Sequence, residues 1–181
     1  MKFYREILLN DGRKAILRHA DAKDAAGVLE EIKQTNAEIN YMGRYADEIT
    51  LTEEKEASML AATAESNDSL LLVADVDGRI VGTAGISPVI AYEKSRHRGG
   101  FGISVCQDFW HLGLGSALTD AIIDIAPKMG FTQIELDVIT ENYRAIHLYL
   151  KKGFVVFGKL EKSMCLRDGS TLDAYLMCKM L

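Results

Sequence analysis

The stretch ISVCQDFWHLGLGSAL, residues 103–118, decides the fold of this chain. Its first three residues are typical of the end of a β-strand, and WHLGLG, residues 110–115, is typical of a tight turn. Ser116 is expected to open an amphipathic helix with an apolar side formed by Leu118, Ala121, Ile122 and Ile125. Free N–H groups at a helix start favour an anion, and glycine lets the main chain approach it closely. The stretch therefore predicts a phosphate-binding loop, although a glycine turn alone is a weak signal.

A second stretch, NYRAIHLYLKKGF, covers residues 142–154. Asn142 is a good helix cap, and Gly153 after two lysines is a normal helix end. Asn142 and Tyr149 are seven residues apart, which is about two helical turns, so they share one face of the helix with Ala145. Taken alone, Tyr149 fits an ordinary core position as well as a functional one.

Together the two stretches resemble the GNAT superfamily of N-acetyltransferases, which bind acetyl-coenzyme A. Family members carry Gln/Arg-x-x-Gly-x-Gly/Ala after their fourth strand, where this chain has WHLGLG. Their Asn-x-x-Ala-x-x-x-Tyr pattern ending in Gly-Phe is matched in order by Asn142, Ala145, Tyr149, Gly153 and Phe154. The resemblance extends over residues 13–180 and departs at Trp110, where Gln or Arg is commoner. Without that side chain, phosphate binding is expected to rest on main-chain N–H groups.

The resemblance implies a role for each matching residue. The pyrophosphate of the coenzyme would lie on the main chain of Leu112, Gly113, Leu114, Gly115 and Ser116. The pantetheine arm would pair with the strand edge at Ile103 and Val105, and the Val105 N–H would polarise the thioester carbonyl. Asn142 would lie beside the coenzyme, and Ala145 would leave room for its arm. Tyr149 would be the general acid that protonates the departing thiolate.

The general base is left open, because several residues suit the role by position. The candidates are Glu48, Glu93, His97, Glu135 and Asp137. Residues 38–42 and 92–98 are expected to border the acceptor pocket. The four histidines show no metal-ligand spacing, so no metal site is expected.

The rest of the pattern predicts the architecture. Strands are expected at residues 6–9, 14–19, 69–75, 79–87, 98–105, 133–138, 155–167 and 172–180, with helices after Asp21 and Thr52 and from Ser116 and Asn142. Residues 10–12, 77–78 and 168–169 carry the Asp-Gly signals of hairpin turns. We therefore expect one α/β domain over residues 1–181, with a single mixed, mostly antiparallel sheet flanked by helices on both faces, as in the GNAT fold.

Composition restricts the partners. A length of 181 residues with 48% hydrophobic and 26% charged residues suits one globular core. The net charge of −5 and the lack of a basic run argue against nucleic-acid binding. Three cysteines without C-x-x-C spacing suggest a reducing cytoplasm, and neither an apolar leader nor a membrane span is expected.

The leading hypothesis is acetyl transfer from acetyl-coenzyme A to a primary amine of a small molecule such as an amino acid or polyamine. A protein N-terminus or lysine is the second choice of acceptor. A non-catalytic coenzyme-A-binding module is a further alternative, which the presence of Tyr149 disfavours. A Rossmann-type nucleotide protein is disfavoured by the meander of early strands. The hairpin over residues 155–180 makes a homodimer possible.

Overall fold

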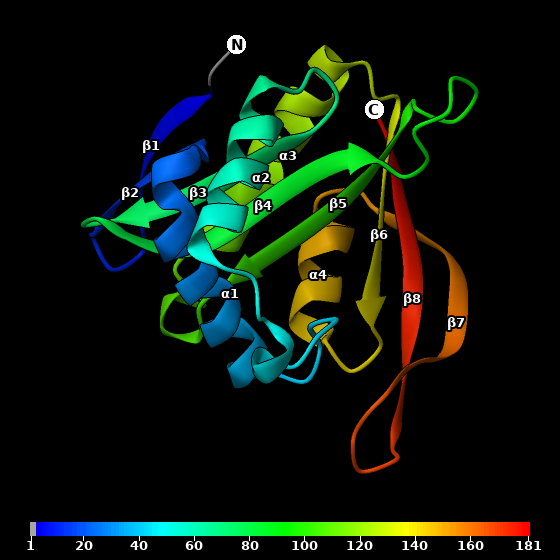
Figure 1. Cartoon of the computed structure of the whole chain (residues 1–181). Coiled ribbons are helices and arrows are strands. Elements are labelled where there is room, and N and C mark those ends of the chain that lie inside the picture. Colours follow the sequence, from blue (N-terminus) through cyan, green and yellow to red (C-terminus); the bar gives the residue numbers. More distant parts are fainter. Residues whose placement is uncertain (1–2) are drawn as a thin grey trace.

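The computed structural model describes residues 3–181 as one eight-stranded sheet with helices on both faces (Figure 1). The strands are β1 Tyr4–Leu8, β2 Lys14–His19, β3 Leu70–Val76, β4 Arg79–Pro88, β5 Arg98–Val105, β6 Gln133–Ile139, β7 Val155–Cys165 and β8 Thr171–Met180. The helices are α1 Ala25–Glu38, α2 Glu53–Glu65, α3 Leu114–Ile125 and α4 Tyr143–Lys151, and 3-10 turns η1 to η4 lie at Ala22–Asp24, Ala46–Glu48, Gln107–Phe109 and Ala126–Met129. The strand order is β1-β2-β3-β4-β5-β6-β8-β7, and only β5 and β6 are parallel. The predicted fold class is confirmed.

Successive side chains of β3 point to opposite faces of the sheet and pack into the two hydrophobic cores. Leu72 and Ala74 belong to the larger core, which includes residues of α3 and α4. Val73, between them, packs in a smaller core with Val28 of α1 and Leu60 of α2. A strand that is buried on both faces needs apolar residues almost throughout, which explains the sequence LLLVADV.

The parallel strands β5 and β6 pair only at their starts. The register joins Arg98 to Gln133, Gly99 to Ile134 and Gly100 to Glu135, and there the pairing stops. Beyond that point β6 stays paired with β8 while β5 stays paired with β4, so the two strands diverge (Figure 1). From Phe101 to Val105, one edge of β5 is left beside α4 with no strand along it in the described chain.

Two helix starts follow the predicted caps, at Thr52 and Asn142, whereas Asp21 caps the 3-10 turn η1 that leads into α1. The Thr52 hydroxyl accepts from the Lys55 N–H at 3.4 Å, and the Asn142 side chain accepts from the Ala145 N–H at 3.2 Å. The helix expected to open at Ser116 begins two residues earlier, at Leu114. Gly113 has φ +87°, and this left-handed cap turns the chain into the helix before Ser116 is reached.

The C-terminal hairpin of β7 and β8 reaches back to residues near the end of α1. At its tip, the Arg167 N–H donates to the Tyr45 hydroxyl at 2.8 Å. The Arg167 guanidinium also donates to both Asp47 oxygens, at 2.8 and 2.9 Å. The hairpin therefore holds the segment that follows α1, which borders both of the cavities described below.

Candidate active site

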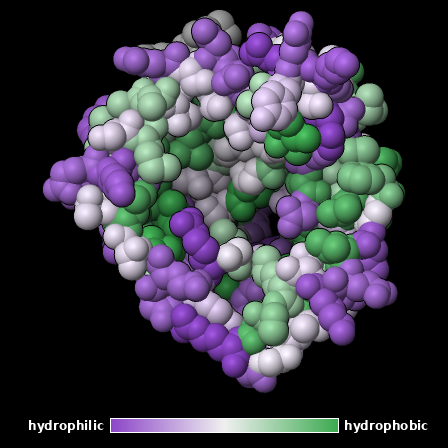
Figure 2. All heavy atoms as spheres, turned by 45° about the vertical axis from the view of Figure 1, so that its right-hand side comes forward, coloured by the Kyte–Doolittle hydropathy of each residue, from purple (hydrophilic) through white to green (hydrophobic). Residues whose placement is uncertain are grey.

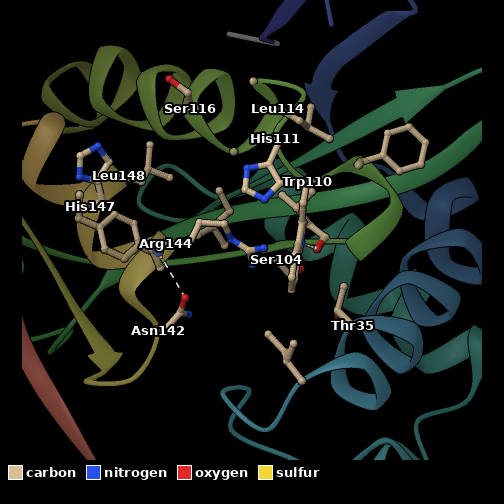
Figure 3. Close-up of a pocket in the computed structure, with 18 of the residues that line it drawn as sticks. Thr35, Ser104, Trp110, His111, Leu114, Ser116, Asn142, Arg144, His147 and Leu148 are labelled. Carbon is tan, nitrogen blue, oxygen red and sulfur yellow. Dashed lines mark hydrogen bonds between the residues drawn. The ribbon is translucent and has the colours of Figure 1, made fainter. Parts of the chain in front are cut away.

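A cavity of about 340 Å³ opens along the unpaired edge of β5. It is enclosed by the end of β5, the glycine turn, the start of α3, α4 and the end of α1, and Figure 3 shows side chains from these elements converging on it. Figure 2 shows the molecule hollowed near the middle of the face it presents. The structure brings nine of the predicted site residues to this lining: Ile103, Val105, Gly113, Leu114, Gly115, Ser116, Asn142, Ala145 and Tyr149. Leu112 is not among the lining residues.

The main chain of β5 presents hydrogen-bonding groups to this cavity. The Cys106 N–H donates to the Val81 carbonyl at 3.0 Å, on the β4 side. In an antiparallel ladder alternate residues face the neighbouring strand, so Ser104 also faces β4 with its main chain while Val105 faces away from it. The indole N–H of Trp110 donates to the Val105 carbonyl at 2.8 Å, which fixes this edge (Figure 3). The Val105 N–H shares that edge and is placed for an incoming acceptor.

The glycine turn is held by the β1–β2 hairpin through its carbonyl groups. The Asn10 N–H donates to the Leu112 carbonyl at 3.1 Å, and the Asn10 side-chain amide donates to the His111 carbonyl at 3.0 Å. The N–H groups of the first turn of α3 have no partner within a helix, as at any helix start. With the carbonyls bound behind the turn, these N–H groups remain for an anion. Leu112 thus supports the turn through its carbonyl.

The space in front of the turn fits a phosphate group. A Cβ built on Gly115 would have only Leu148 within 4 Å, at 3.7 Å, and a Cβ on Gly113 would have only the Asn10 side chain, at 3.7 Å. The space that a side chain would occupy at Gly113 and at Gly115 is therefore free of close main-chain atoms, as a pyrophosphate-binding loop requires.

Arg144 supplies a cation that sequence reasoning missed. Its guanidinium carbon lies 3.0 Å from the centroid of the Trp110 ring, and both residues line the cavity (Figure 3). Trp110 itself carries no charge, but its indole face holds the Arg144 guanidinium from α4, so the site does have a side-chain cation. The only signal in the sequence is that Arg144 follows the helix cap by two positions, which does not identify its aromatic partner.

We expect Arg144→Gln to weaken coenzyme A binding by about tenfold at low salt and to reduce its salt dependence, because one cation of the cavity lining is lost. Calorimetric titration at two salt concentrations measures both effects. Lys94→Gln is the matched control, since Lys94 is exposed, lies outside the cavity lining and changes the net charge equally. Equal losses in the two variants would contradict a specific role for Arg144.

Tyr149 is both a core residue and a cavity residue. Its side chain is 7% exposed and packs against Phe101 and Phe154, with ring centroids 6.2 and 5.7 Å away. Burial raises the pKa of the Tyr149 phenol, and the charge of Asp137 raises it further. The hydroxyl is therefore protonated at neutral pH, as a proton donor must be.

A second cavity, of about 560 Å³, lies on the opposite side of β5, under α1 and α2. Gly100 and Gly102 of β5 line it, together with Arg44 and the buried Glu56. Burial raises the pKa of Glu56, and the charge of Arg44 opposes that shift. Met42, Ile103 and Ser104 line both cavities, so the two meet across β5.

The predicted borders of the acceptor pocket are met in part. Met42, from residues 38–42, lines both cavities, but no residue of 92–98 lines either one. The five candidates for the general base also lie outside both linings. Glu135 receives two hydrogen bonds from Arg98 across the paired starts of β5 and β6, and Glu48 accepts from the Tyr45 N–H at 2.7 Å.

Glu31 of α1 is a buried acid that sequence reasoning also missed. Its side chain is 1% exposed, and neither carboxylate oxygen has a hydrogen-bond partner among residues 3–181. Burial raises the pKa of Glu31 to about 7; the nearby Ser104 hydroxyl lowers it and the charge of Glu38 raises it. The Ser104 hydroxyl lowers this pKa as a hydrogen-bond donor near the carboxylate, although it forms no hydrogen bond with either Glu31 oxygen. The Ser104 oxygen lies 2.9 Å from the Thr83 hydroxyl oxygen, and either hydroxyl can be the donor of that bond. The adjacent Glu30 hides this position in the sequence, because Glu-Glu in a helix is usually exposed.

The Glu31 carboxyl has a consequence for stability. Its pKa is 4.5 in the unfolded chain and about 7 in the fold, so the native state binds the extra proton. The resulting stabilisation is complete below pH 4.5 and is lost as the pH rises through about 7. We expect the free energy of unfolding of Glu31→Gln to rise by up to about 3 kcal/mol relative to that of wild type as the pH increases through this window. Chemical denaturation at about pH 5 and pH 8 measures the change. The same pH dependence of the unfolding free energy in wild type and Glu31→Gln would contradict this expectation. Glu30→Gln, at the exposed neighbouring position, is the control.

No group of three or more His, Cys, Asp or Glu side chains in residues 3–181 is arranged to hold a metal ion. No helix in the described part of the chain is both long and apolar enough to cross a membrane.

A phosphate cradle, an open strand edge and a buried phenol around one cavity define a coenzyme-A-dependent acyltransferase. Residues 31–154 match the model of the acetyltransferase (GNAT) family. The chain is 30% identical to the L-amino acid N-acetyltransferase AaaT of Escherichia coli K12, over 91% of this chain and 96% of that protein. The chain therefore belongs to the GNAT family of N-acetyltransferases, whose co-substrate is acetyl-coenzyme A.

Solved structures agree with this assignment. A GNAT-family acetyltransferase from Streptococcus pneumoniae superposes with a TM-score of 0.88 at 32% identity, covering 92% of this chain and 99% of that one. The putative acetyltransferase YncA from Salmonella typhimurium, solved with its cofactor acetyl-CoA, superposes with a TM-score of 0.80 at 21% identity, covering 91% and 92% of the two chains. At 21% identity, the similarity to YncA supports the fold alone.

Proposed function

We propose that this N-acetyltransferase acetylates the α-amino group of a free L-amino acid. The observation that carries the proposal is the second cavity, which meets the coenzyme cavity across β5 and contains one cation, Arg44. An arginine fork matches a carboxylate in geometry and charge, so Arg44 would bind the α-carboxylate of the acceptor. The likeness to the L-amino acid N-acetyltransferase of Escherichia coli supports this choice of acceptor.

The residues of the coenzyme cavity would divide the work of transfer. The main-chain N–H groups of Leu114, Gly115 and Ser116 would bind the pyrophosphate, with Arg144 beside them. Bound acetyl-coenzyme A supplies a thioester whose carbonyl the amine attacks. The Val105 N–H would donate to that carbonyl oxygen as negative charge develops on it. The Tyr149 hydroxyl would give its proton to the departing sulfur.

The acceptor cavity would place the amine on the far side of β5. The glycines of β5 leave room there, because a Cβ built on Gly102 would meet no atom within 4 Å. The amine could then reach the strand edge near Ser104, which lines both cavities. Glu56, which lines the same cavity, would face the side chain of the amino acid and favour polar or basic side chains.

The test is release of free thiol from acetyl-coenzyme A with a panel of amines. The panel holds the common L-amino acids, their carboxamides, spermidine and a short peptide with a free N-terminus. We expect the best amino acid to exceed its carboxamide at least about tenfold in kcat/KM, and Arg44→Gln to abolish that preference. Arg96→Gln is the control, because Arg96 lies outside both cavities. A peptide or spermidine preferred over every amino acid would replace the proposed acceptor.

Three further parts of the proposal concern the whole chain. We infer that residues 1–181 form one domain, since a single sheet links the first and last strands.

The exposed apolar side chains of the last hairpin support a homodimer: Val155, Val156, Phe157 and Leu160. The three free cysteines suit a reducing cytoplasm. Sedimentation of wild type and Phe157→Ser tests the dimer, and a wild-type monomer at all concentrations would contradict it.

A further inference from the structure

Glu31 lies on α1, the helix whose next residues help to line both cavities. Thr35, one turn further along the helix, lines the coenzyme cavity, and its hydroxyl donates to the Glu31 carbonyl at 3.0 Å. Residues four apart share a helix face, so the Glu31 side chain lies on the sheet side of α1. A buried carboxylate without hydrogen bonds is costly, and the native fold retains it. Such a group calls for a functional explanation.

The hydroxyl of Ser104 on β5 is the polar side chain that lowers the pKa of Glu31. Its oxygen lies 2.9 Å from the Thr83 hydroxyl oxygen on β4, in the paired register of the two strands. Ser104 lies close enough to Glu31 to lower its pKa as a hydrogen-bond donor, and it lines both cavities. It also directly precedes Val105, whose main chain faces the coenzyme cavity. Ser104 thus connects a buried acid to the place where the two substrates would meet.

We propose that Glu31 is the proton acceptor for the acceptor amine, acting through the Ser104 hydroxyl. This inference rests on the proposed N-acetyl transfer. As the ammonium group gives a proton to the Ser104 oxygen, the Ser104 hydroxyl gives its own proton to the Glu31 carboxylate. The neutral amine then forms a C–N bond to the thioester carbonyl carbon, and the C–S bond breaks. The nitrogen then loses its second N–H proton to solvent, and Tyr149, which gives a proton to the departing sulfur, regains one from solvent. Glu31 finally returns its proton to solvent by way of Ser104, so the net reaction releases one proton.

The charged groups around Glu31 leave it free for this role. On its own helix, the Glu38 carboxylate already accepts from the Gln107 N–H at 2.8 Å and from Gln34 at 2.7 Å. After β5, the buried Cys106 thiol has a pKa raised by its own burial and by the charge of Glu31. From β4, Arg79 is paired with Asp108 at 2.8 Å. From α2, Glu56 lines the acceptor cavity, and no cation forms an ion pair with Glu31 in residues 3–181.

The burial of Glu31 suits a proton acceptor at neutral pH. A base is most effective when its pKa lies near the working pH, and burial raises the pKa of Glu31 to about 7. The same burial would make Glu31 a poor structural residue, since it stabilises the fold less as it ionises. A residue kept only for packing would not weaken the fold in this way at neutral pH.

The test compares Glu31→Gln with the control Glu30→Gln, using the amine of the panel with the highest kcat/KM. We expect Glu31→Gln to lose about 10²-fold in kcat/KM near pH 7, with coenzyme A affinity retained and thermal stability at least that of wild type. The loss should shrink as the pH exceeds the pKa of the amine, because the amine is then already neutral. Ser104→Ala, which interrupts the path, should show the same pH-dependent loss.

The outcomes separate the inference from the function on which it rests. A loss in Glu31→Gln that is equal at every pH, or full activity near pH 7, would overturn the role of Glu31 while wild-type transfer stands. Full activity in Ser104→Ala would overturn the path through that hydroxyl. A wild-type protein that releases no thiol with any amine would overturn the proposed function, and the inference with it.

Discussion

Replacing Gly115 with valine is expected to weaken coenzyme A binding by about 10²-fold, or about 3 kcal/mol, with little loss of stability. Gly115 lies in the first turn of α3, and a Cβ there would contact only Leu148, at 3.7 Å. The helix can therefore accept a side chain, but the methyl groups would occupy the space that the pyrophosphate needs. Calorimetric titration of coenzyme A into the variant measures the loss, and thermal unfolding checks that the fold remains.

Position 115 gives a cleaner test than position 113. Gly113 has φ +87°, so a valine there would strain the main chain whatever the space around it. Gly115→Ala adds the Cβ alone and should fall between glycine and valine in affinity. A folded Gly115→Val variant with unchanged affinity would place the phosphates elsewhere.

Removing the hydroxyl of Tyr149 is expected to lower kcat by about 10²-fold while coenzyme A affinity changes little. The phenylalanine ring can keep the contacts with Phe101 and Phe154, so packing is preserved. A proton donated only as the C–S bond breaks contributes to the transition state and not to binding. General-acid contributions reach about 10⁴-fold, and a thiolate, being a good leaving group, justifies the lower end.

Tyr143→Phe is the matched control for this change. Tyr143 is the first residue of the same helix and is 76% exposed, so losing its hydroxyl should leave kcat unchanged. Steady-state kinetics of both variants at saturating acetyl-coenzyme A decide the matter. Full turnover in Tyr149→Phe would reduce Tyr149 to a packing residue.

Local patterns made the coenzyme side of the molecule predictable. The glycine turn, the Asn142 cap and the spacing to Tyr149 lie within short stretches whose geometry the main chain dictates, and the structure gathers them around one cavity. The helix start was wrong by two residues, because the left-handed conformation of Gly113 begins α3 at Leu114.

The missed residues depend on contacts between distant segments. Arg144 is an ordinary helix cation until the fold sets it against the indole of Trp110. Glu31 looks like half of a solvated acidic pair, and only the crossing of α1 over Ser104 buries it. Residues 92–98 were expected at the acceptor pocket, yet they follow β4 at the end of the sheet where β5 and β6 are still paired. None of these long-range contacts follows from a repeating pattern in the sequence.

Acetyl transfer itself is tested most directly by mass spectrometry of the amine product alongside the release of coenzyme A thiol. The proposed function predicts that wild-type protein forms N-acetylated L-amino acid and free thiol in equal amounts, and that Tyr149→Phe slows both together. Thiol release without an acetylated amine would indicate thioester hydrolysis instead. Neither product, from a folded protein that binds coenzyme A, would contradict the account.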